Sequence, residues 1–227
     1  MLADAAQEGA QAVVSLGDVV GYGADPAACV ERLAERAVSM VAGNHEHGTL
    51  DLMDLDWFNA VARAAVLWTR ETLSPDHHRF LEAWPLSTSL EEATLVHASP
   101  GAPEEWEYLL SADDGFAAFA GFDTRLCFIG HSHRPGAWSM GSSGPEHDPA
   151  PKAFQRIPLE PGRRYLVNVG SVGQPRDRDP RAAYAIWDRE TRTVRLRRVA
   201  YDVRAAADKI IRAGLPRALA ERLARGA

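Results

Sequence analysis

Five side chains of the kinds that bind metal ions lie at or just beyond the ends of short apolar runs. They are Asp18, Asn44, His97, His131 and His133. Carboxylate, amide oxygen and imidazole together suit Mn, Fe, Zn or Ni better than an ion that prefers thiolates. His131 and His133 are two residues apart, so in extended backbone both side chains point the same way and can serve neighbouring ions. This pattern predicts a metal centre.

The apolar runs themselves predict the strands that position these side chains. The runs are residues 12–16, 38–42, 94–98 and 125–129. Short apolar runs that end in turn residues are typical of buried strands. In open α/β sheets, ligands bind beyond the carboxyl ends of the strands. We therefore expect the five side chains to meet at one edge of a sheet.

Helical spacing and capping residues predict the other elements. Helices are expected over residues 26–36, about 57–73, 75–84 and 116–119, and in two short segments around 214–216. Further strands are expected from Trp138 onward, near residues 153–157, 165–169, 183–187 and 194–199. Residues 141–151, rich in Gly, Ser and Pro, predict a loop between strands. The tryptophans at 57, 68 and 84 are expected in the core.

The composition favours one elaborated domain over residues 1–227. Of the 227 residues, 46% are hydrophobic and 25% charged, which is typical of a chain that folds in water. The net charge of −6 argues against a partner with a phosphate backbone or an acidic lipid surface. The first residues lack the pattern of a secretory signal, so we expect a cytoplasmic protein without a membrane span. The sequence indicates no particular oligomeric state.

Cysteine usage agrees with this assignment. Cys29 and Cys127 are the only two cysteines, and they are far apart and in no Cys-x-x-Cys motif. A disulfide framework or a thiolate metal site is therefore disfavoured. We expect both thiols to be reduced and buried.

The order of the motifs resembles the calcineurin-like metallophosphoesterase superfamily. Four of that family's five signature blocks are present, as Gly17-Asp18, Gly43-Asn44-His45-Glu46, His97 and Gly130-His131-Ser132-His133. The stretch Asn168–Asp177 also resembles a loop that follows the metal motifs in small bacterial members, with Val169 where proline is usual. The resemblance covers most of the chain. It implies an α/β fold, a four-layer sandwich of two mixed β-sheets flanked by helices.

The resemblance also implies roles for the predicted ligands. Asp18 would bridge two divalent metal ions. Asn44, His97 and His131 would complete the second site, and His133 would belong to the first. Two such ions would lower the pKa of a bound water from 15.7 towards about 7, so that a metal-bound hydroxide could attack phosphorus at neutral pH.

We also predict roles for three further residues, His45, Arg176 and Glu46. His45 would face the phosphate as general acid or oxyanion stabiliser. Arg176 could bind a substrate phosphate, or could pair locally with Asp177 or Asp179. Glu46 could orient His45 or simply cap the turn. His47, His77, His78 and His147 are expected to be bystanders.

The family's first block, Asp-x-His on the first strand, is absent from this sequence. Without it the first metal site keeps only Asp18 and His133, and two ligands hold an ion poorly. Our hypothesis is that the natural protein begins roughly 20 residues upstream, which allows for a strand and the first turns of a helix.

The predicted function is metal-dependent hydrolysis of a small phosphodiester, nucleotide or phosphomonoester. The sequence does not choose among these substrates, because relatives with the same metal blocks differ in them. The alternative is a non-catalytic interaction scaffold of the same fold, a reading that the absent block favours. A DNA-repair nuclease is a weaker third option because of the negative net charge.

Overall fold

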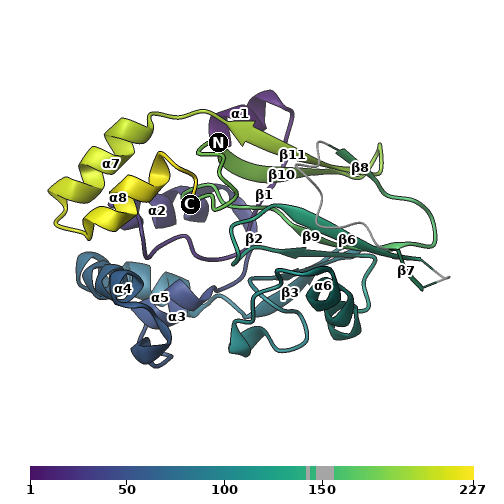
Figure 1. Ribbon diagram of the computed structural model, residues 1–227, viewed down its shortest axis with the longest axis horizontal. Helices are drawn as coiled ribbons and strands as arrows, with labels where there is room; N and C mark the ends of the chain where they lie inside the picture. Colours follow the sequence, from purple (N-terminus) through teal and green to yellow (C-terminus); the bar gives the residue numbers. More distant parts are fainter. Residues whose placement is uncertain (142–143, 147–155) are drawn as a thin grey trace.

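Two β layers pack face to face and are flanked by helices (Figure 1). The computed structural model describes residues 1–141, 144–146 and 156–227. One layer is a six-stranded sheet in the order β3-β4-β5-β9-β6-β7. Its strands are β3 (Ser87–Leu90), β4 (Ala93–Val96), β5 (Leu126–Ile129), β9 (Arg164–Asn168), β6 (Gly136–Gly141) and β7 (Gly144–Glu146). The sheet is mixed, because β4, β5 and β9 are parallel and the outer pairs are antiparallel.

The other layer consists of two smaller sheets in the described residues. β1 (Val13–Ser15) pairs in parallel with β2 (Ala37–Met40). β10 (Ala182–Asp188), β11 (Thr193–Val199) and β8 (Arg156–Pro158) form an antiparallel sheet with β11 in the centre. Apolar side chains from both layers, such as Leu126 and Val194, form a common core. Burying this surface between the sheets is what holds the layers together.

The helices cover the outer faces and one end of the sandwich (Figure 1). They are α1 (Leu2–Gln7), α2 (Pro26–Arg36), α3 (Asn44–Thr49), α4 (Ala60–Thr72), α5 (Pro75–Glu82), α6 (Ala112–Ala118), α7 (Val203–Arg212) and α8 (Arg217–Leu223). Short 3-10 turns occur at Leu55–Trp57, Pro103–Glu105 and Phe119–Gly121. Several helices begin at a side chain that accepts from the first backbone N–H groups: Asn59, Ser74, Ser111 and Asp202. In the described part of the chain, no helix has the length and apolar character needed to cross a bilayer.

The predicted α/β fold with mixed sheets and flanking helices is confirmed, and most predicted elements occur within a few residues of their expected bounds. Residues 44–49, for which the sequence predicted no helix, form α3. Of the predicted loop, residue 141 ends β6 and residues 144–146 form β7, whereas residues 142–143 and 147–151 lie outside the described residues. The strand expected at 153–157 is described only from Arg156, where β8 begins. His147 also lies outside the described residues.

Two burial predictions were wrong. Trp57 was expected in the core because it shares the helical spacing of α4, but it precedes that helix in a 3-10 turn and is 73% exposed. Cys29 is exposed on α2, because the buried face of this helix is formed by Pro26 and Val30 instead. Cys127, in the centre of β5, is buried as expected.

Replacement of Leu126 tests the two-layer packing. This side chain is 0% exposed in β5 and belongs to the core that the two layers share, so Leu126→Ala should lower the free energy of unfolding by about 2–5 kcal/mol. Leu52→Ala, at a residue that is 59% exposed, should change it by about 0.5 kcal/mol at most. Urea denaturation followed by tryptophan fluorescence measures both, and similar losses in the two variants would contradict this packing.

Candidate metal centre

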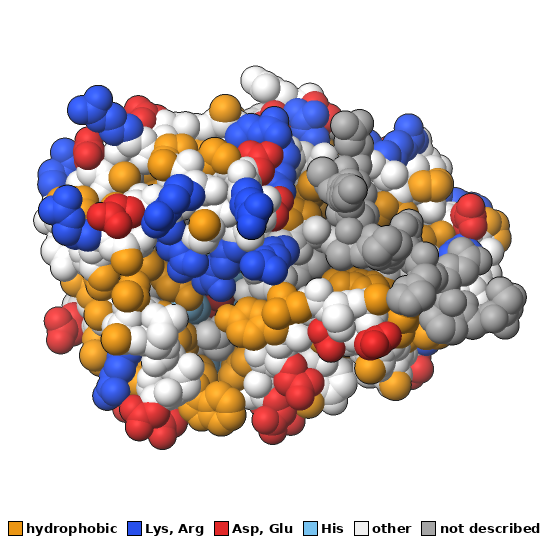
Figure 2. Space-filling model, in the orientation of Figure 1, with side chains coloured by type: hydrophobic (Ala, Val, Ile, Leu, Met, Phe, Trp, Pro, Cys, Tyr) orange, Lys and Arg blue, Asp and Glu red, His pale blue; other side chains and the backbone are white. Residues whose placement is uncertain are grey.

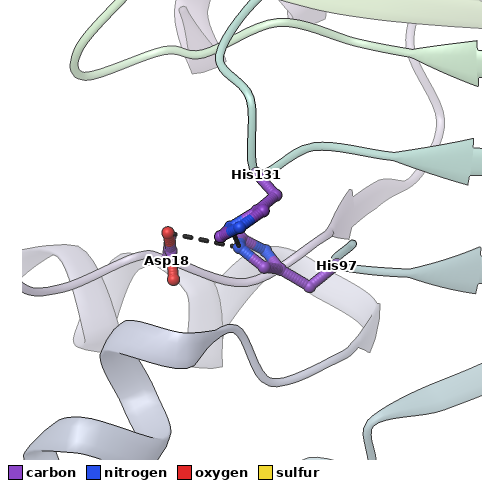
Figure 3. Close-up of side chains that lie close together, drawn as sticks. All are labelled: Asp18, His97 and His131. Atoms are coloured by element: carbon purple, nitrogen blue, oxygen red, sulfur yellow. Dashed lines mark hydrogen bonds and ion pairs between the residues drawn. The ribbon is translucent and has the colours of Figure 1, made fainter. Parts of the chain in front are cut away.

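Three of the predicted ligands meet where the loops after β1, β4 and β5 converge (Figure 3). Asp18, His97 and His131 each offer a ligand atom, and these atoms lie within 4.8 Å of one another. His97 and His131 are buried, and the Asp18 side chain is 8% exposed. A carboxylate and two imidazoles that can reach the same ion form a donor set for a divalent transition metal.

His97 occupies the middle of this group. Its Nδ1 lies 2.6 Å from the Leu16 carbonyl oxygen. A carbonyl only accepts, so Nδ1 carries the proton and the lone pair of Nε2 faces the site. Nε2 lies 3.2 Å from Asp18 Oδ2 and 3.0 Å from His131 Nδ1. Ligand atoms about 2.1 Å from one ion lie roughly 3 to 3.5 Å apart, so these separations fit a shared metal.

His133 is oriented in the same way but lies outside this group of three. Its Nδ1 donates to the Gln174 carbonyl oxygen at 2.7 Å, which leaves the lone pair on Nε2. The backbone N–H of Arg176 in turn donates to the His133 carbonyl oxygen at 3.1 Å. A second ring N–H held by a backbone carbonyl is the usual way in which proteins fix the tautomer of a metal-binding histidine.

One further predicted ligand atom, Asn44 Oδ1, is buried and makes no hydrogen bond in the described structure. Asn44 and His131 also line one cavity of about 230 Å³. Buried polar atoms normally have a partner, because leaving one unpaired costs about 1–3 kcal/mol. The residues present therefore fit a bound divalent ion.

The backbone of the site is strained at three of the predicted ligands. Asp18, His131 and His133 have φ values of 51°, 57° and 58°, in the left-handed region that non-glycine residues rarely adopt. Gly43 allows a close approach here, because a Cβ at that position would lie 2.3 Å from Asp18 Oδ1. Strain of this kind persists only where the surrounding structure holds it, and it is concentrated at functional sites.

Glu46 holds two of the loops together. Its Oε2 accepts from the backbone N–H of Asp18 at 2.7 Å and of Gly43 at 2.8 Å, and its Oε1 accepts from that of Val19 at 2.8 Å. The sequence left open whether Glu46 orients His45 or caps the turn. In the structure Glu46 caps its own helix, α3, and it also binds backbone N–H groups of the loop after β1. In return, the backbone N–H of His45 donates to Asp18 Oδ1 at 3.0 Å.

The electrostatics of the site keep most of its imidazoles neutral. Burial lowers the pKa of His131 to about 3 and that of His45 to about 4. Burial and the charge of Arg176 lower the pKa of His133 to about 3. Neutral imidazole is the form that binds a metal ion.

The pKa values of the two acidic side chains of the site, Asp18 and Glu46, are shifted in opposite directions. Burial alone would raise the pKa of Asp18, but attraction to His97 and His45 outweighs it and holds that pKa well below its ordinary value. The pKa of His97 is raised in turn, because its attraction to Asp18 exceeds the effect of burial. Burial and the charge of Asp18 raise the pKa of Glu46 to about 7.

His45 lies beside these ligands between two aromatic rings. The centroid of its ring is 4.1 Å from that of Tyr22 and 5.0 Å from that of Phe58. Gly21 has φ of 104°, and a Cβ there would lie 1.9 Å from His45 Nδ1. Close packing therefore fixes the imidazole without making it one of the three clustered ligand residues.

Arg176 does not form the local pairs that the sequence left open. Asp177 pairs with Arg198, and Asp179 pairs with Arg181 at 2.6 Å. The guanidinium of Arg176 instead donates to Gln174 Oε1 at 3.0 Å and to the Tyr22 hydroxyl at 3.1 Å. Among the described residues no carboxylate pairs with it, so its charge is available to an anion.

Sequence reasoning missed several residues that support the site. Asn168, the last residue of β9, donates from Nδ2 to the Gly130 carbonyl oxygen at 2.6 Å and to Ser132 Oγ at 2.9 Å. Tyr108 stacks on His131 with ring centroids 4.1 Å apart. Asn168 belongs to the stretch that already resembled the family loop, and a buried asparagine at a strand end was the available signal. No local pattern distinguishes Tyr108 or Tyr22.

Comparisons with known proteins place this arrangement in context. A family model described as a calcineurin-like phosphoesterase superfamily domain matches residues 1–192. An uncharacterised protein of Methanocaldococcus jannaschii is 37% identical over 229 residues, covering 98% of this chain and 90% of that protein. The crystal structure of a metallophosphoesterase from Sphaerobacter thermophilus has a TM-score of 0.84 and 37% identity, covering 100% of this chain and 93% of that chain.

A more distant solved structure shows the same fold. A hypothetical protein from Pyrococcus horikoshii OT3 has a TM-score of 0.77 at 19% identity, and the match covers 100% of this chain and 90% of that chain. At this level of identity the likeness concerns the fold alone.

Replacement of Glu46 tests its role as the link between the loops. Glu46→Gln turns an amide NH₂ toward backbone N–H groups, so at least one buried donor loses its acceptor, at about 1–3 kcal/mol for each. We expect the free energy of unfolding of the metal-free protein to fall by about 2 kcal/mol or more in chemical denaturation. Glu82→Gln, at an exposed position of α5, should change it by less than about 0.5 kcal/mol. Equal stability of the two variants would be incompatible with this role.

Proposed function

The chain belongs to the calcineurin-like phosphoesterase superfamily, and from this premise we propose that it hydrolyses a small phosphate ester with two divalent metal ions. The substrate would be a phosphodiester, a nucleotide or a phosphomonoester. The observation that carries the proposal is the meeting of Asp18, His97 and His131, whose ligand atoms lie within 4.8 Å of one another. Family membership supports phosphoester hydrolysis in general.

The ligands would divide between two ions, with Asp18 shared. Asn44, His97 and His131 would hold one ion together with Asp18, and His133 would contribute to the other. The unpartnered Asn44 Oδ1 and the 3.0 Å separation of His97 Nε2 from His131 Nδ1 support the first assignment. The mixed oxygen and nitrogen donors suit Mn, Fe, Zn or Ni, and the experiments below use Mn. When bound, such ions supply Lewis acidity to phosphoryl oxygens and an activated water.

The chain's own side chains would bind and orient the substrate. His45, fixed between Tyr22 and Phe58, would donate to a phosphate oxygen or protonate the leaving group. Arg176 would bind a phosphate oxygen with a guanidinium that no carboxylate of the described residues neutralises. Both groups act on charge that develops during hydrolysis, which is where fixed donors accelerate a reaction most.

Loss of His97 tests the metal assignment. His97→Ala removes the central ligand, so the affinity of the metal-free protein for Mn should fall about tenfold or more, with loss of hydrolysis of generic mono- and diester substrates. His77→Ala, at a helix position that pairs with Glu31, serves as the matched control. A competition titration with a chelator measures the affinity. Unchanged affinity in the His97 variant would rule this ligand out.

Loss of His45 separates catalysis from metal binding. His45→Ala should lower turnover by about 10²- to 10⁴-fold and leave metal content nearly unchanged, because His45 is not a ligand in this scheme. Metal analysis and steady-state kinetics on the same preparation give both values. Metal loss in this variant would contradict the role. If neither the unaltered chain nor one extended upstream hydrolyses the generic esters, the scaffold alternative is favoured instead.

A further inference from the structure

A second cavity adjoins the metal centre on the side of Tyr22 and has a different chemical character. Its volume is about 430 Å³, and its lining includes Tyr22, Asn59, Arg222 and Arg225. Tyr22 is shared with the metal centre, because its ring packs against His45 with centroids 4.1 Å apart. The cavity is therefore one tyrosine ring away from the predicted reaction site.

Positive charge dominates the lining of this cavity. Two arginines line it, and no acidic side chain does, but Ala227, the last residue of the chain, is also part of the lining. Arg222 Nε donates to an oxygen of Ala227, whose terminal carboxylate offsets one of the two positive charges. Among the described residues, neither Arg222 nor Arg225 pairs with a side-chain carboxylate. Figure 2 shows Lys and Arg side chains gathered along one rim of a hollow, with a histidine visible at its bottom.

Two other features add to the positive field. The 13-residue helix α4 directs its N-terminus at the cavity, since Asn59, Val61 and Ala62 are part of the lining. A helix N-terminus carries a partial positive charge that favours anions. Arg176, bonded to the Tyr22 hydroxyl, is close enough to Arg222 that their repulsion, after burial, lowers the pKa of Arg222. An anion that binds near both guanidinium groups would relieve this repulsion.

The end of the chain is held firmly beside the loop that carries Arg176. The backbone N–H of Arg178 donates to the Gly226 carbonyl oxygen at 2.8 Å. A Cβ at Gly226, whose φ is 59°, would lie 2.7 Å from the backbone of Asp179. These contacts fix Arg222, on α8, and Arg225, just beyond it, relative to the loop of Arg176, so the cavity is preorganised for a ligand.

We propose that Arg222 and Arg225 form a second anion subsite, which binds a phosphate group carried by the substrate in addition to the one that is hydrolysed. The inference rests on the proposed function and narrows its substrate class. Because Tyr22 separates the two positions, the two phosphates are attached to different atoms of a small organic group, such as a sugar, rather than to each other. Guanidinium groups bind phosphate oxygens in pairs, which gives such a subsite geometric selectivity.

The test compares two ligands that differ by one phosphate. A nucleoside 3′,5′-bisphosphate and the corresponding 5′-monophosphate are titrated calorimetrically into metal-free protein, and their inhibition constants are measured on the Mn-loaded enzyme. We expect the unaltered protein to bind the bisphosphate more tightly than the monophosphate. The double variant Arg222→Gln/Arg225→Gln should reduce this preference about tenfold or more, because each charged hydrogen bond contributes that order of affinity.

Matched variants make the outcome specific. Arg217→Gln removes an exposed arginine from the same helix outside the cavity, and it should leave the preference unchanged. Arg222→Lys keeps the charge and should retain more of the preference than Arg222→Gln. Circular dichroism and thermal unfolding of each variant confirm that α8 still docks. Equal weakening of both ligands, or no weakening of either, would overturn the subsite.

The experiments distinguish failure of the proposed hydrolase function from failure of the second anion subsite. If the Mn-loaded protein hydrolyses no ester, the hydrolase assignment fails, but the titration of metal-free protein still decides whether the arginine cavity discriminates between the two ligands. If hydrolysis occurs and the preference is absent or insensitive to Arg222 and Arg225, the hydrolase assignment stands and the subsite is rejected.

Discussion

The geometry of the candidate metal centre depends on the hydrogen bonds that the Glu46 carboxylate accepts. This carboxylate accepts hydrogen bonds from backbone N–H groups of the loop after β1 and of the start of α3. The Asp18 carboxylate accepts a hydrogen bond from the backbone N–H of His45. Two carboxylates thus join two loops that are more than 20 residues apart in the sequence. Buried charged hydrogen bonds of this kind are stronger than neutral ones, and they are costly to break. They can hold Asp18 at a φ of 51°, which isolated chain would not favour.

The parallel strands β4, β5 and β9 supply the other half of the site. They end at the same edge, so His97, His131 and Asn168 arrive together although they are distant in the chain. Backbone carbonyls then fix the imidazoles: that of Leu16 orients His97, and that of Gln174 orients His133. His97 and His133 are thus each held by a carbonyl group from another loop. The centre is consequently a property of the whole edge of the sandwich rather than of any single motif.

The surroundings of the metal centre differ in chemistry from one side to the other. On one side a small cavity next to His131 is lined by aromatic side chains, among them Tyr108, and by the acidic side chains of Glu105 and Glu107. On the other side a larger cavity is lined by Tyr22 and two arginines and has no acidic side chain. The two sides therefore differ in charge. Such asymmetry fixes the direction in which a ligand lies.

The sequence by itself indicated most of the strands and helices, and it indicated Asp18, His97 and His131 as candidate ligands, because apolar runs, caps and turn glycines act locally and residues of metal-binding types follow the strands. It could not determine which side chains face each other. The exposure of Trp57 depends on how its segment docks, whereas the packing of Tyr22 against His45, the bonds of Glu46 and the bond of Arg176 to Tyr22 join separate segments. Only the packed tertiary structure decided these, since a contact between distant segments leaves no periodic trace along the chain.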